Sequence, residues 1–292
     1  MKKVLSVFIL LLFFLGVISG DVFARDMVQV KGSDTLVNLV QKLSEEYMNA
    51  NKGKYIAVTG GGSGTGIAAL INNTCDIANA SRQIKQKEID KAESLGIKIN
   101  RVIVAMDGLS VIVNNKNSVN NLTIEQLGAI FRGEITNWKD LGGKDLPITL
   151  YGRQSNSGTF VFFMESVVKG DYSLNMKRMN GNSQIVESVK QDIGGIGYVG
   201  VGYVKKSTGI LAVNVAKDSN TGYVSPLNAI DVVEGNYPIV RALNQYVNTK
   251  SVNKVRDFIN FEISEKGQKI VEEQGFFCIS KGVVEDNKKA VK

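Results

Sequence analysis

Three short loops rich in glycine and hydroxyl side chains contain the residues of this 292-residue sequence that are best suited to bind an anion. They are GSDT (32–35), GGGSGTG (60–66) and RQSNSGT (153–159), and each precedes a segment with helical periodicity. At a helix start, up to four backbone N–H groups lack an internal partner and the helix dipole is positive. Each loop is therefore a candidate oxyanion receptor, although Ser, Thr and Asp in any one of them are also ordinary helix caps.

Two further features favour one site shared by these loops. Arg153 opens the third loop and can pair with an anion through two parallel N–H groups. Ser81 and Arg82 directly follow a short apolar strand, and ligands of open α/β sheets bind at the carboxyl ends of the strands. Because two loops lie in the first half of the chain and one in the second, they predict a cleft that closes on a tetrahedral anion.

The sequence contains no histidine, which excludes nucleophile–His pairs, His general bases and His-dependent metal sites. Its two cysteines, Cys75 and Cys278, are too few for a zinc site or a disulfide scaffold. An enzyme would have to rely on Lys, Tyr or carboxylate chemistry. The composition therefore favours binding over catalysis, and we expect neither a metal nor a cofactor.

The formal net charge of the chain is +7, but its basic residues are spread along the sequence. Nucleic-acid binding would call for Lys and Arg clustered with aromatic residues between them, and the mature chain offers only pairs such as Lys205-Lys206. We therefore expect no nucleic-acid partner. A small anionic ligand is compatible with the charge, which speaks mainly to solubility and steering.

The first 24 residues have the pattern of a cleaved secretory signal. Lys2 and Lys3 form a basic start, residues 4–18 form an apolar run, and Ala24 is a small residue at the expected cleavage site. This run is shorter than the roughly 20 apolar residues that a membrane span needs. Since no cysteine lies near the cut, we expect no lipid anchor and a soluble periplasmic protein.

Short apolar strands alternate with helical patterns along the chain, which favours an α/β fold with largely parallel sheets. In the first half, strands are predicted at 28–30, 55–59, 76–78 and 102–104, and helices at 36–47, 64–72 and 85–95. The alternation restarts at Leu122, with helices predicted at 124–131, 159–168 and 183–190 and strands at 148–150 and 197–199.

These patterns divide the mature chain into two α/β lobes. Residues 108–114 and 237–247 are extended and apolar, and are predicted to cross between the lobes and to act as a two-strand hinge. The first lobe would then comprise residues 25–113 and 239–292, and the second residues 114–238. This division places Cys75 and Cys278 in one lobe, where a disulfide is one of two open alternatives.

At these loops the sequence resembles the substrate-binding proteins of phosphate ABC transporters, the PstS type. The resemblance extends over nearly the whole mature chain, and it keeps the order and spacing of its motifs. They are VKGSDTLVNLVQKLSEEY (30–47), TGGGSGTGIAALINNTCDIANASR (59–82), DGLSVIVN (107–114), LTIEQLGAIFRGEITNWKDLGG (122–143), YGRQSNSGTFVFF (151–163) and GGIGYVG (194–200). It implies a type II periplasmic-binding-protein clamshell that traps phosphate and delivers it to a membrane permease, without enzymatic activity.

The resemblance also implies a set of ligand contacts. Thr35 and Leu36 match backbone contacts of the first loop, Ser63 matches a hydroxyl of the glycine-rich loop, and Arg153 begins a matching R-x-x-x-S-G-T segment. Together with the hydroxyl residues of the loops, the expected phosphate-binding residues are Ser33, Thr35, Leu36, Ser63, Ser81, Arg153, Ser157, Gly158 and Thr159.

One position departs from the pattern. Some members of the family have an aspartate, which accepts the proton of hydrogen phosphate, where this chain has Ser81. Asp34 is the nearest acidic candidate for that role, and its alternative is to cap the helix that follows it.

The resulting hypothesis is a monomeric, extracytoplasmic phosphate-binding protein that serves an ABC permease. Two alternatives stay open at this point. One is a receptor for another oxyanion, such as sulfate, molybdate or tungstate, and the other is a secreted hydrolase that uses Ser157 or Ser63. The absence of histidine weighs against the hydrolase, because its serine would have no imidazole base.

Overall fold

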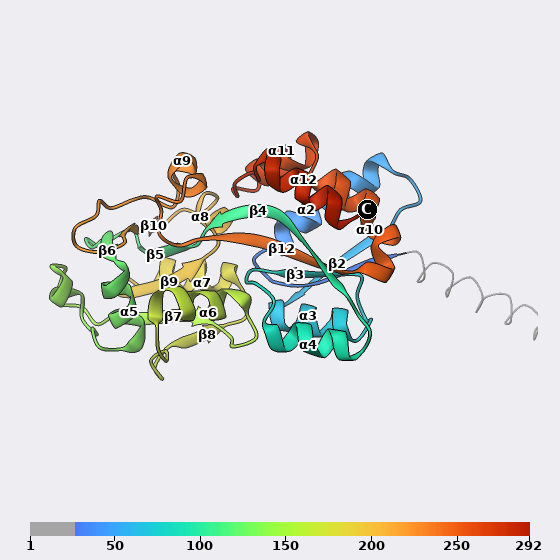
Figure 1. Ribbon diagram of the computed structural model, residues 1–292. Coiled ribbons are helices and arrows are strands. Elements are labelled where there is room, and N and C mark those ends of the chain that lie inside the picture. Colours follow the sequence, from blue (N-terminus) through green and yellow to red (C-terminus); the bar gives the residue numbers. More distant parts are fainter. Residues whose placement is uncertain (1–26) are drawn as a thin grey trace, which may run out of the picture.

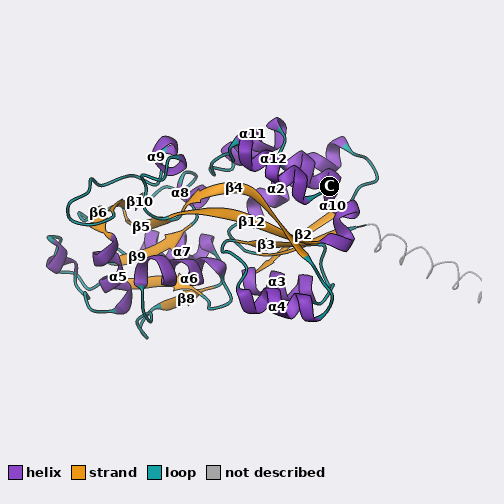
Figure 2. Ribbon diagram, in the orientation of Figure 1, coloured by secondary structure: helices purple, strands orange, loops and turns teal. Residues whose placement is uncertain are grey.

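The structure is a computed structural model that describes residues 27–292, so the predicted signal at residues 1–24 lies outside the described residues. Two mixed β-sheets of five strands, each covered by helices, form two neighbouring lobes (Figure 1). Two long strands run between the lobes (Figure 2). This confirms the predicted architecture of two α/β lobes joined by a two-strand hinge.

The sheet of the first lobe has the strand order β2-β1-β3-β12-β4. Its strands are β1 (Val28–Gly32), β2 (Ile56–Gly61), β3 (Ile77–Ala80), β4 (Ile99–Gly108) and β12 (Val240–Asn248). On one face lie the helices α3 (Ser63–Ile71) and α4 (Gln86–Ser94). On the other lie α2 (Val37–Ala50), α10 (Val252–Glu262), α11 (Glu265–Glu273) and α12 (Lys281–Ala290), with a 3-10 turn at Thr249–Ser251 before α10 (Figure 1).

The sheet of the second lobe has the order β10-β5-β9-β7-β8. Its strands are β5 (Ser110–Asn114), β7 (Thr149–Arg153), β8 (Lys177–Met179), β9 (Gly195–Val199) and β10 (Ile210–Ala212), and a separate pair is formed by β6 (Asn121–Thr123) and β11 (Asn214–Ala216). Its helices are α5 (Ile124–Arg132), α6 (Gly158–Phe163), α7 (Asn182–Gln191), α8 (Val201–Val204) and α9 (Ala229–Val233), with a 3-10 helix at Trp138–Leu141 and a π-helix at Met164–Val168.

The sheets are mixed, whereas the sequence predicted largely parallel ones. Strand β1 is parallel to β2 and β3, with Val30 opposite Val58 and Ile77, but β12 runs antiparallel to β3 and β4. The reason is topological, because the chain leaves the first lobe along β4 and returns along β12. In the second lobe β5, which continues from β4, is likewise antiparallel to both of its neighbours.

The two sheets change over within one residue. Strand β4 ends at Gly108 in the first sheet, and β5 begins at Ser110 in the second. The boundary predicted between residues 113 and 114 lies later in the chain than this change, and the one between residues 238 and 239 lies just before β12 begins at Val240. The assignment of residues to lobes stays a prediction.

Helical periodicity located α2 correctly. Leu39, Val40, Leu43 and Tyr47 recur at spacings of three and four, and all four are buried on one side of the helix. One predicted helix, at residues 159–168, differs from the structure, which has α6 followed there by the π-helix Met164–Val168. Lys169, the residue after the π-helix, has a left-handed backbone conformation. The helices α10 to α12 had not been predicted.

The two cysteines do not form a disulfide, because both are free thiols. Cys75 packs beside α3, 3.7 Å from the carbonyl oxygen of Gly66, and the thiol of Cys278 donates to the carbonyl of Gln268 at 3.3 Å. Burial raises the pKa of Cys75 to about 12 and that of Cys278 to about 11, so both thiols stay protonated near neutral pH. The disulfide alternative is therefore wrong.

A buried acid–amide pair lies between the first sheet and α10. Glu262 is fully buried, and its Oε1 accepts a hydrogen bond from Nε2 of Gln245 at 3.0 Å. Burial raises the pKa of Glu262 to about 8, although the bond from Gln245 acts in the opposite direction. The other oxygens of the pair, Oε2 of Glu262 and Oε1 of Gln245, are buried without a partner in the described chain. A protonated Glu262 supplies the O–H that such a pair needs.

The pair predicts a pH-dependent stability. The carboxyl pKa rises from 4.5 in the unfolded chain to about 8 in the folded one, so the folded state binds more protons between these values. In urea titrations at several pH values, the free energy of unfolding should receive a contribution from Glu262 that falls as the pH rises through this window, by about 1.4 kcal/mol per pH unit.

Glu262→Gln keeps two complementary amides and should remove this contribution. The matched control is Glu265→Gln, which changes an exposed carboxylate of α11 and should leave the slope as it is. An unchanged slope in Glu262→Gln would show that Glu262 does not titrate in this range.

Candidate functional site

Five hydroxyl side chains meet in the interior where the two lobes touch. Ser33, Thr35, Ser63 and Ser81 come from the first lobe and Thr159 from the second, and all five are buried. We call them the hydroxyl cluster. Oγ of Ser33 donates to Oγ of Ser81 at 2.8 Å, and the hydroxyl oxygens of Thr35 and Thr159 are 2.9 Å apart across the lobes. Oγ of Ser81 lies 3.3 Å from that of Thr159 and 3.4 Å from that of Ser63.

The cluster lies where the fold places the carboxyl ends of parallel strands. Strands β1, β2 and β3 end at Gly32, Gly61 and Ala80, directly before the loops that carry the first-lobe hydroxyls. In the second lobe β7 ends at Arg153, and its loop leads into α6 with Ser157 as the N-cap. This is the usual position of a ligand site in an open α/β sheet. The structure therefore brings together the three loops, as predicted.

Backbone and guanidinium N–H groups orient these hydroxyls. Oγ of Ser33 accepts from the N–H of Thr35 at 3.3 Å, and Oγ of Ser63 accepts from the N–H of Ser81 at 3.0 Å. Oγ of Ser157, the N-cap, accepts from the N–H of Phe160 at 3.4 Å, and Oγ1 of Thr159 accepts from Nη1 of Arg241 at 3.0 Å. A hydroxyl has one proton to donate. An oxygen that accepts an N–H still has its own proton to donate. That of Ser33 is donated to Oγ of Ser81, and the hydroxyls of Ser63 and Thr159 face other hydroxyls of the cluster at 2.9 to 3.4 Å.

An ion pair connects the lobes beside the cluster. Nη2 of Arg153, a buried residue of the second lobe, donates to Oδ2 of Asp34 in the first lobe and to the carbonyl of Asn180 at 2.8 Å. Nε of Arg153 is buried without a partner among the described residues. Arg153 therefore keeps a buried N–H donor that no acceptor among the described residues satisfies.

Asp34 does not cap the helix that follows it. Helix α2 has Leu36 as its N-cap residue, without a side-chain cap bond, whereas Oδ1 of Asp34 accepts from the N–H of Gly61 at 2.8 Å. The carboxylate thus joins the first loop to the glycine-rich loop and to Arg153. The capping alternative is wrong, while a role as proton acceptor is untested by these contacts.

Leu36 and Arg82, which the sequence also placed near the anion site, have hydrogen-bond partners outside the hydroxyl cluster. The N–H of Leu36 donates to the carbonyl of Ser33 at 3.1 Å within the first loop. Arg82 pairs in a bidentate manner with Glu88 at 2.7 and 2.8 Å, so its charge is committed outside the hydroxyl cluster.

The two lobes are in contact at the loop tips. Nδ2 of Asn156 donates to the carbonyl of Gly61 at 2.9 Å, and the N–H of Gly64 donates to the carbonyl of Asn156 at 3.0 Å. The phenol of Tyr203 adds a bond to the carbonyl of Asp34 at 2.8 Å. The structure is therefore a closed form of the two-lobed protein.

Sequence reasoning missed a buried ion pair next to the cluster. Asp107 at the end of β4 and Arg241 near the start of β12 are bonded to each other, and Arg241 reaches Thr159. Burial lowers the pKa of Arg241, and the charge of Asp107 offsets part of that effect. Charged residues are almost never fully buried unless paired. An Arg within an apolar crossing segment was thus a signal that could have revealed the pair.

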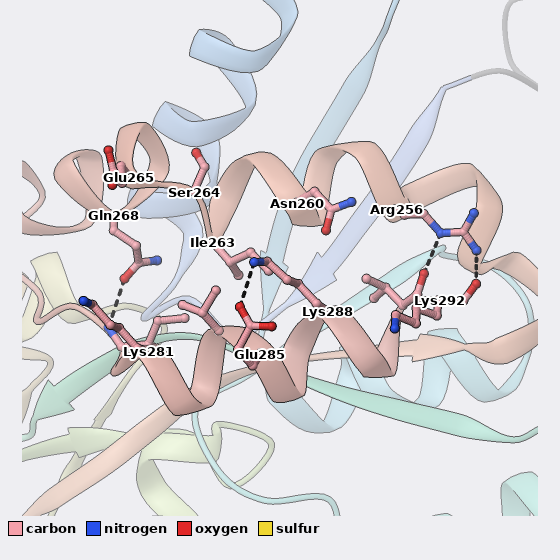
Figure 3. A pocket seen from close by; sticks show the side chains of 13 residues that line it. Arg256, Asn260, Ile263, Ser264, Glu265, Gln268, Lys281, Glu285, Lys288 and Lys292 are labelled. Carbon is pink, nitrogen blue, oxygen red and sulfur yellow. Dashed lines mark hydrogen bonds and ion pairs between the residues drawn. The ribbon is translucent and has the colours of Figure 1, made fainter.

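A groove lies on another part of the molecule. It has a volume of about 1050 Å³ and lies between α10, α11 and α12 (Figure 3). Arg256 on its wall donates to the backbone carbonyls of Val291 and Lys292 and so fastens α12 (Figure 3). No member of the hydroxyl cluster lines this groove, which therefore supports the terminal helix rather than the candidate site.

Residues 27–292 hold no group of three His, Cys, Asp or Glu residues arranged to bind a metal ion. None of their helices combines the length and the apolar character that a membrane crossing requires.

Comparison with known proteins gives consistent matches. The family model of the PBP superfamily domain matches residues 19–266. The phosphate-binding protein PstS of Pseudomonas aeruginosa is 34% identical over 280 residues, covering 89% of this chain and 84% of its own length. Protein SphX of Synechococcus elongatus is 32% identical over 266 residues, covering 86% and 77%.

Two solved structures of phosphate-transport proteins are similar to this chain over most of its length. A Clostridium perfringens protein, described as a phosphate ABC transporter substrate-binding protein with bound phosphate, has a TM-score of 0.79 at 28% identity and covers 87% of this chain and 100% of its own. An ABC-type phosphate transport receptor from Vibrio cholerae has a TM-score of 0.70 at 27% identity, covering 86% and 100%.

Gly158 offers a test of the close contact between the lobes. A Cβ at this position would lie 2.3 Å from Oγ of Ser63 and 2.8 Å from Oγ of Ser81. We expect Gly158→Ala to push the lobes apart and to enlarge the radius of gyration measured by small-angle X-ray scattering with the ligand present. Gly222→Ala, where a Cβ meets nothing within 4 Å, is the control. Equal radii for both variants would contradict the closed packing of Gly158.

Proposed function

This chain belongs to the PBP superfamily, among the phosphate-binding proteins of the PstS type, and from this premise we propose that it captures inorganic phosphate between its lobes and delivers it to an ABC permease. The observation that carries the proposal is the buried hydroxyl cluster, in which the oxygens of Ser33, Ser63 and Thr159 already accept protein N–H groups. Such a lining offers donors, and a tetrahedral anion offers four oxygens to accept them.

The proposed ligand contacts come from both lobes. Most are donors in the hydroxyl cluster or beside it, and one of them, Arg153, brings a charge. The full set is Ser33, Thr35, Leu36, Ser63, Ser81, Arg153, Ser157, Gly158 and Thr159. Gly158 belongs to it because only a residue without a side chain lets α6 approach Ser63 and Ser81 so closely.

Capture proceeds by closure of the lobes. In the open form the first lobe offers the hydroxyls of Ser33, Thr35, Ser63 and Ser81. Hinge rotation then brings Thr159 and Arg153 onto the anion until it is dehydrated and fully hydrogen-bonded. Leaving a buried donor or acceptor unpaired costs about 1–3 kcal/mol, so the closed form is favoured when an anion fills the site.

Asp34 is the proposed acceptor of the ligand's proton. It belongs to the first loop, accepts from the N–H of Gly61 in the glycine-rich loop, and is the carboxylate that contacts Arg153 directly. Sulfate carries no proton at neutral pH, so a carboxylate in the site repels it without compensation. This arrangement favours hydrogen phosphate over sulfate.

The contacts weigh against the hydrolase alternative. Oγ of Ser63 accepts a backbone N–H, Oγ of Ser157 serves as a helix cap, and the sequence has no histidine to take a proton from either. We therefore propose a transport protein without catalytic activity. It is exported by its signal at residues 1–24, acts as a monomer in the periplasm, and meets its permease in the closed form.

Calorimetric titration of the mature protein with phosphate, sulfate and molybdate tests the proposal. We expect binding of phosphate well below millimolar concentration and much weaker binding of the other anions. Arg153→Ala should weaken phosphate binding by about 100-fold or more, because a buried charge-assisted bond is lost. Arg132→Ala, which removes a surface arginine paired with Glu134, should bind as the unmodified protein does. Preferred binding of sulfate or molybdate would replace phosphate as the ligand.

Asp34→Asn removes the charge of the side chain and keeps its size, so it tests what that charge contributes to anion preference. The amide oxygen is a weaker, uncharged acceptor for the ligand's O–H and no longer repels sulfate, so the preference for phosphate over sulfate should shrink by about tenfold or more. The ratio of the two dissociation constants, measured by the same titration, gives the result. A ratio equal to that of the unmodified protein would remove Asp34 from anion discrimination.

A further inference from the structure

A second buried arginine lies next to the hydroxyl cluster, on the strands that connect the lobes. Arg241 belongs to β12 and Asp107 to β4, and their side chains are 2% and 0% exposed. Nε and Nη2 of Arg241 both donate to Oδ2 of Asp107, at 2.9 and 2.7 Å. This two-bond contact fixes the plane of the guanidinium group.

The remaining nitrogen of Arg241 contacts both lobes. Nη1 donates to the carbonyl oxygen of Ser81 in the first lobe and to Oγ1 of Thr159 in the second, each at 3.0 Å. Oδ1 of Asp107 accepts from the N–H of Val201 in the second lobe at 2.9 Å. The ring of Phe162, in α6, lies 5.4 Å from the guanidinium carbon. The pair is therefore bonded to both lobes when they are closed.

Stability alone does not account for this pair. A buried ion pair pays a large desolvation cost, and a well-packed apolar pair in its place is often as stable or more stable. The position of Nη1 suggests another use. Because it donates to Oγ1 of Thr159, the proton of that hydroxyl must point away from Arg241, toward Thr35, Ser81 or an anion lying among them.

We propose that Arg241, held by Asp107, is a positioning residue of the anion site, which orients the hydroxyl of Thr159 as a donor to the ligand in the closed form. This inference rests on the proposed function. The charge of Arg241 is neutralised by Asp107, so the pair adds little to the long-range attraction that brings an anion into the cleft. Its contribution appears after closure and acts on dissociation.

Removing the pair should therefore raise the dissociation rate and leave the association rate unchanged. The double variant Asp107→Asn/Arg241→Gln replaces it by two neutral side chains of similar size and leaves no single charge buried. We expect radiolabelled phosphate, chased with excess unlabelled phosphate, to leave this variant at least 30-fold faster than the unmodified protein. The association rate should change by less than threefold.

Two further variants separate positioning from a general effect on the hinge. Arg101→Gln removes an arginine of β4 that donates to Oδ1 of Asn244 on β12 at 2.7 Å, and should leave the dissociation rate within threefold. Arg241→Lys keeps the buried charge. A single ammonium group cannot make two hydrogen bonds to Asp107 and also donate to Thr159, so this variant should also speed the dissociation of phosphate. Circular dichroism melting shows that each variant is folded.

The decisive measurement is a double-mutant cycle with Thr159→Val. If Arg241 acts through Thr159, adding Arg241→Lys to Thr159→Val should change the phosphate dissociation rate by less than threefold. If the combined variant instead dissociates at a rate increased by the product of the two single effects, the positioning role is overturned. An unchanged dissociation rate in both Arg241→Lys and Asp107→Asn/Arg241→Gln would overturn it as well. An unmodified protein that binds no phosphate would instead reject the proposed function, so the two failures are distinguishable.

Discussion

A buried hydrogen-bond donor must find an acceptor, and this requirement governs the centre of the molecule. Five hydroxyls and two arginines are gathered where the lobes touch, far from bulk water. Three of the hydroxyl oxygens, those of Ser33, Ser63 and Thr159, already accept an N–H from the protein, and the hydroxyl protons are shared among the members of the cluster. An oxyanion placed among them would offer these protons charged acceptors, which form stronger hydrogen bonds than neutral hydroxyls do. In the proposed function, the closed arrangement and the ligand therefore stabilise each other.

The rest of the fold serves to assemble these donors from distant parts of the chain. Parallel strands in both lobes end at the same interface, so Ser33, Ser63, Ser81 and Thr159 meet although up to 126 positions separate them. The crossing strands then add Arg241, which lies on β12 and reaches Thr159. The antiparallel pairing of β4 and β12 is thus part of the site as well as of the hinge.

The sequence predicted the loops and the two-lobed plan because both rest on local patterns. Glycines and hydroxyls before a helix have a known local geometry, and apolar spacing located α2 and its neighbours. It could not show that Asp107 and Arg241 pair, because these residues are 134 positions apart and their contact depends on the register of the two strands that carry them. Nor could it decide the state of Cys75 and Cys278, which depends on three-dimensional distance. The use of Asp34 was equally a matter of tertiary contact, since its partners are Gly61 and Arg153.

The short passage between the sheets also limits how the molecule moves. At the point where β4 gives way to β5, the N–H of Leu109 donates to the carbonyl of Ile239, and the phenol of Tyr237 donates to the carbonyl of Leu109 at 2.8 Å. The two crossing segments are therefore hydrogen-bonded to each other between the two sheets, and we expect them to bend together as one ribbon. A paired ribbon bends more readily about one axis than it shears sideways. We therefore expect opening and closing to follow one path, which would return the same donors to the same places each time the lobes close.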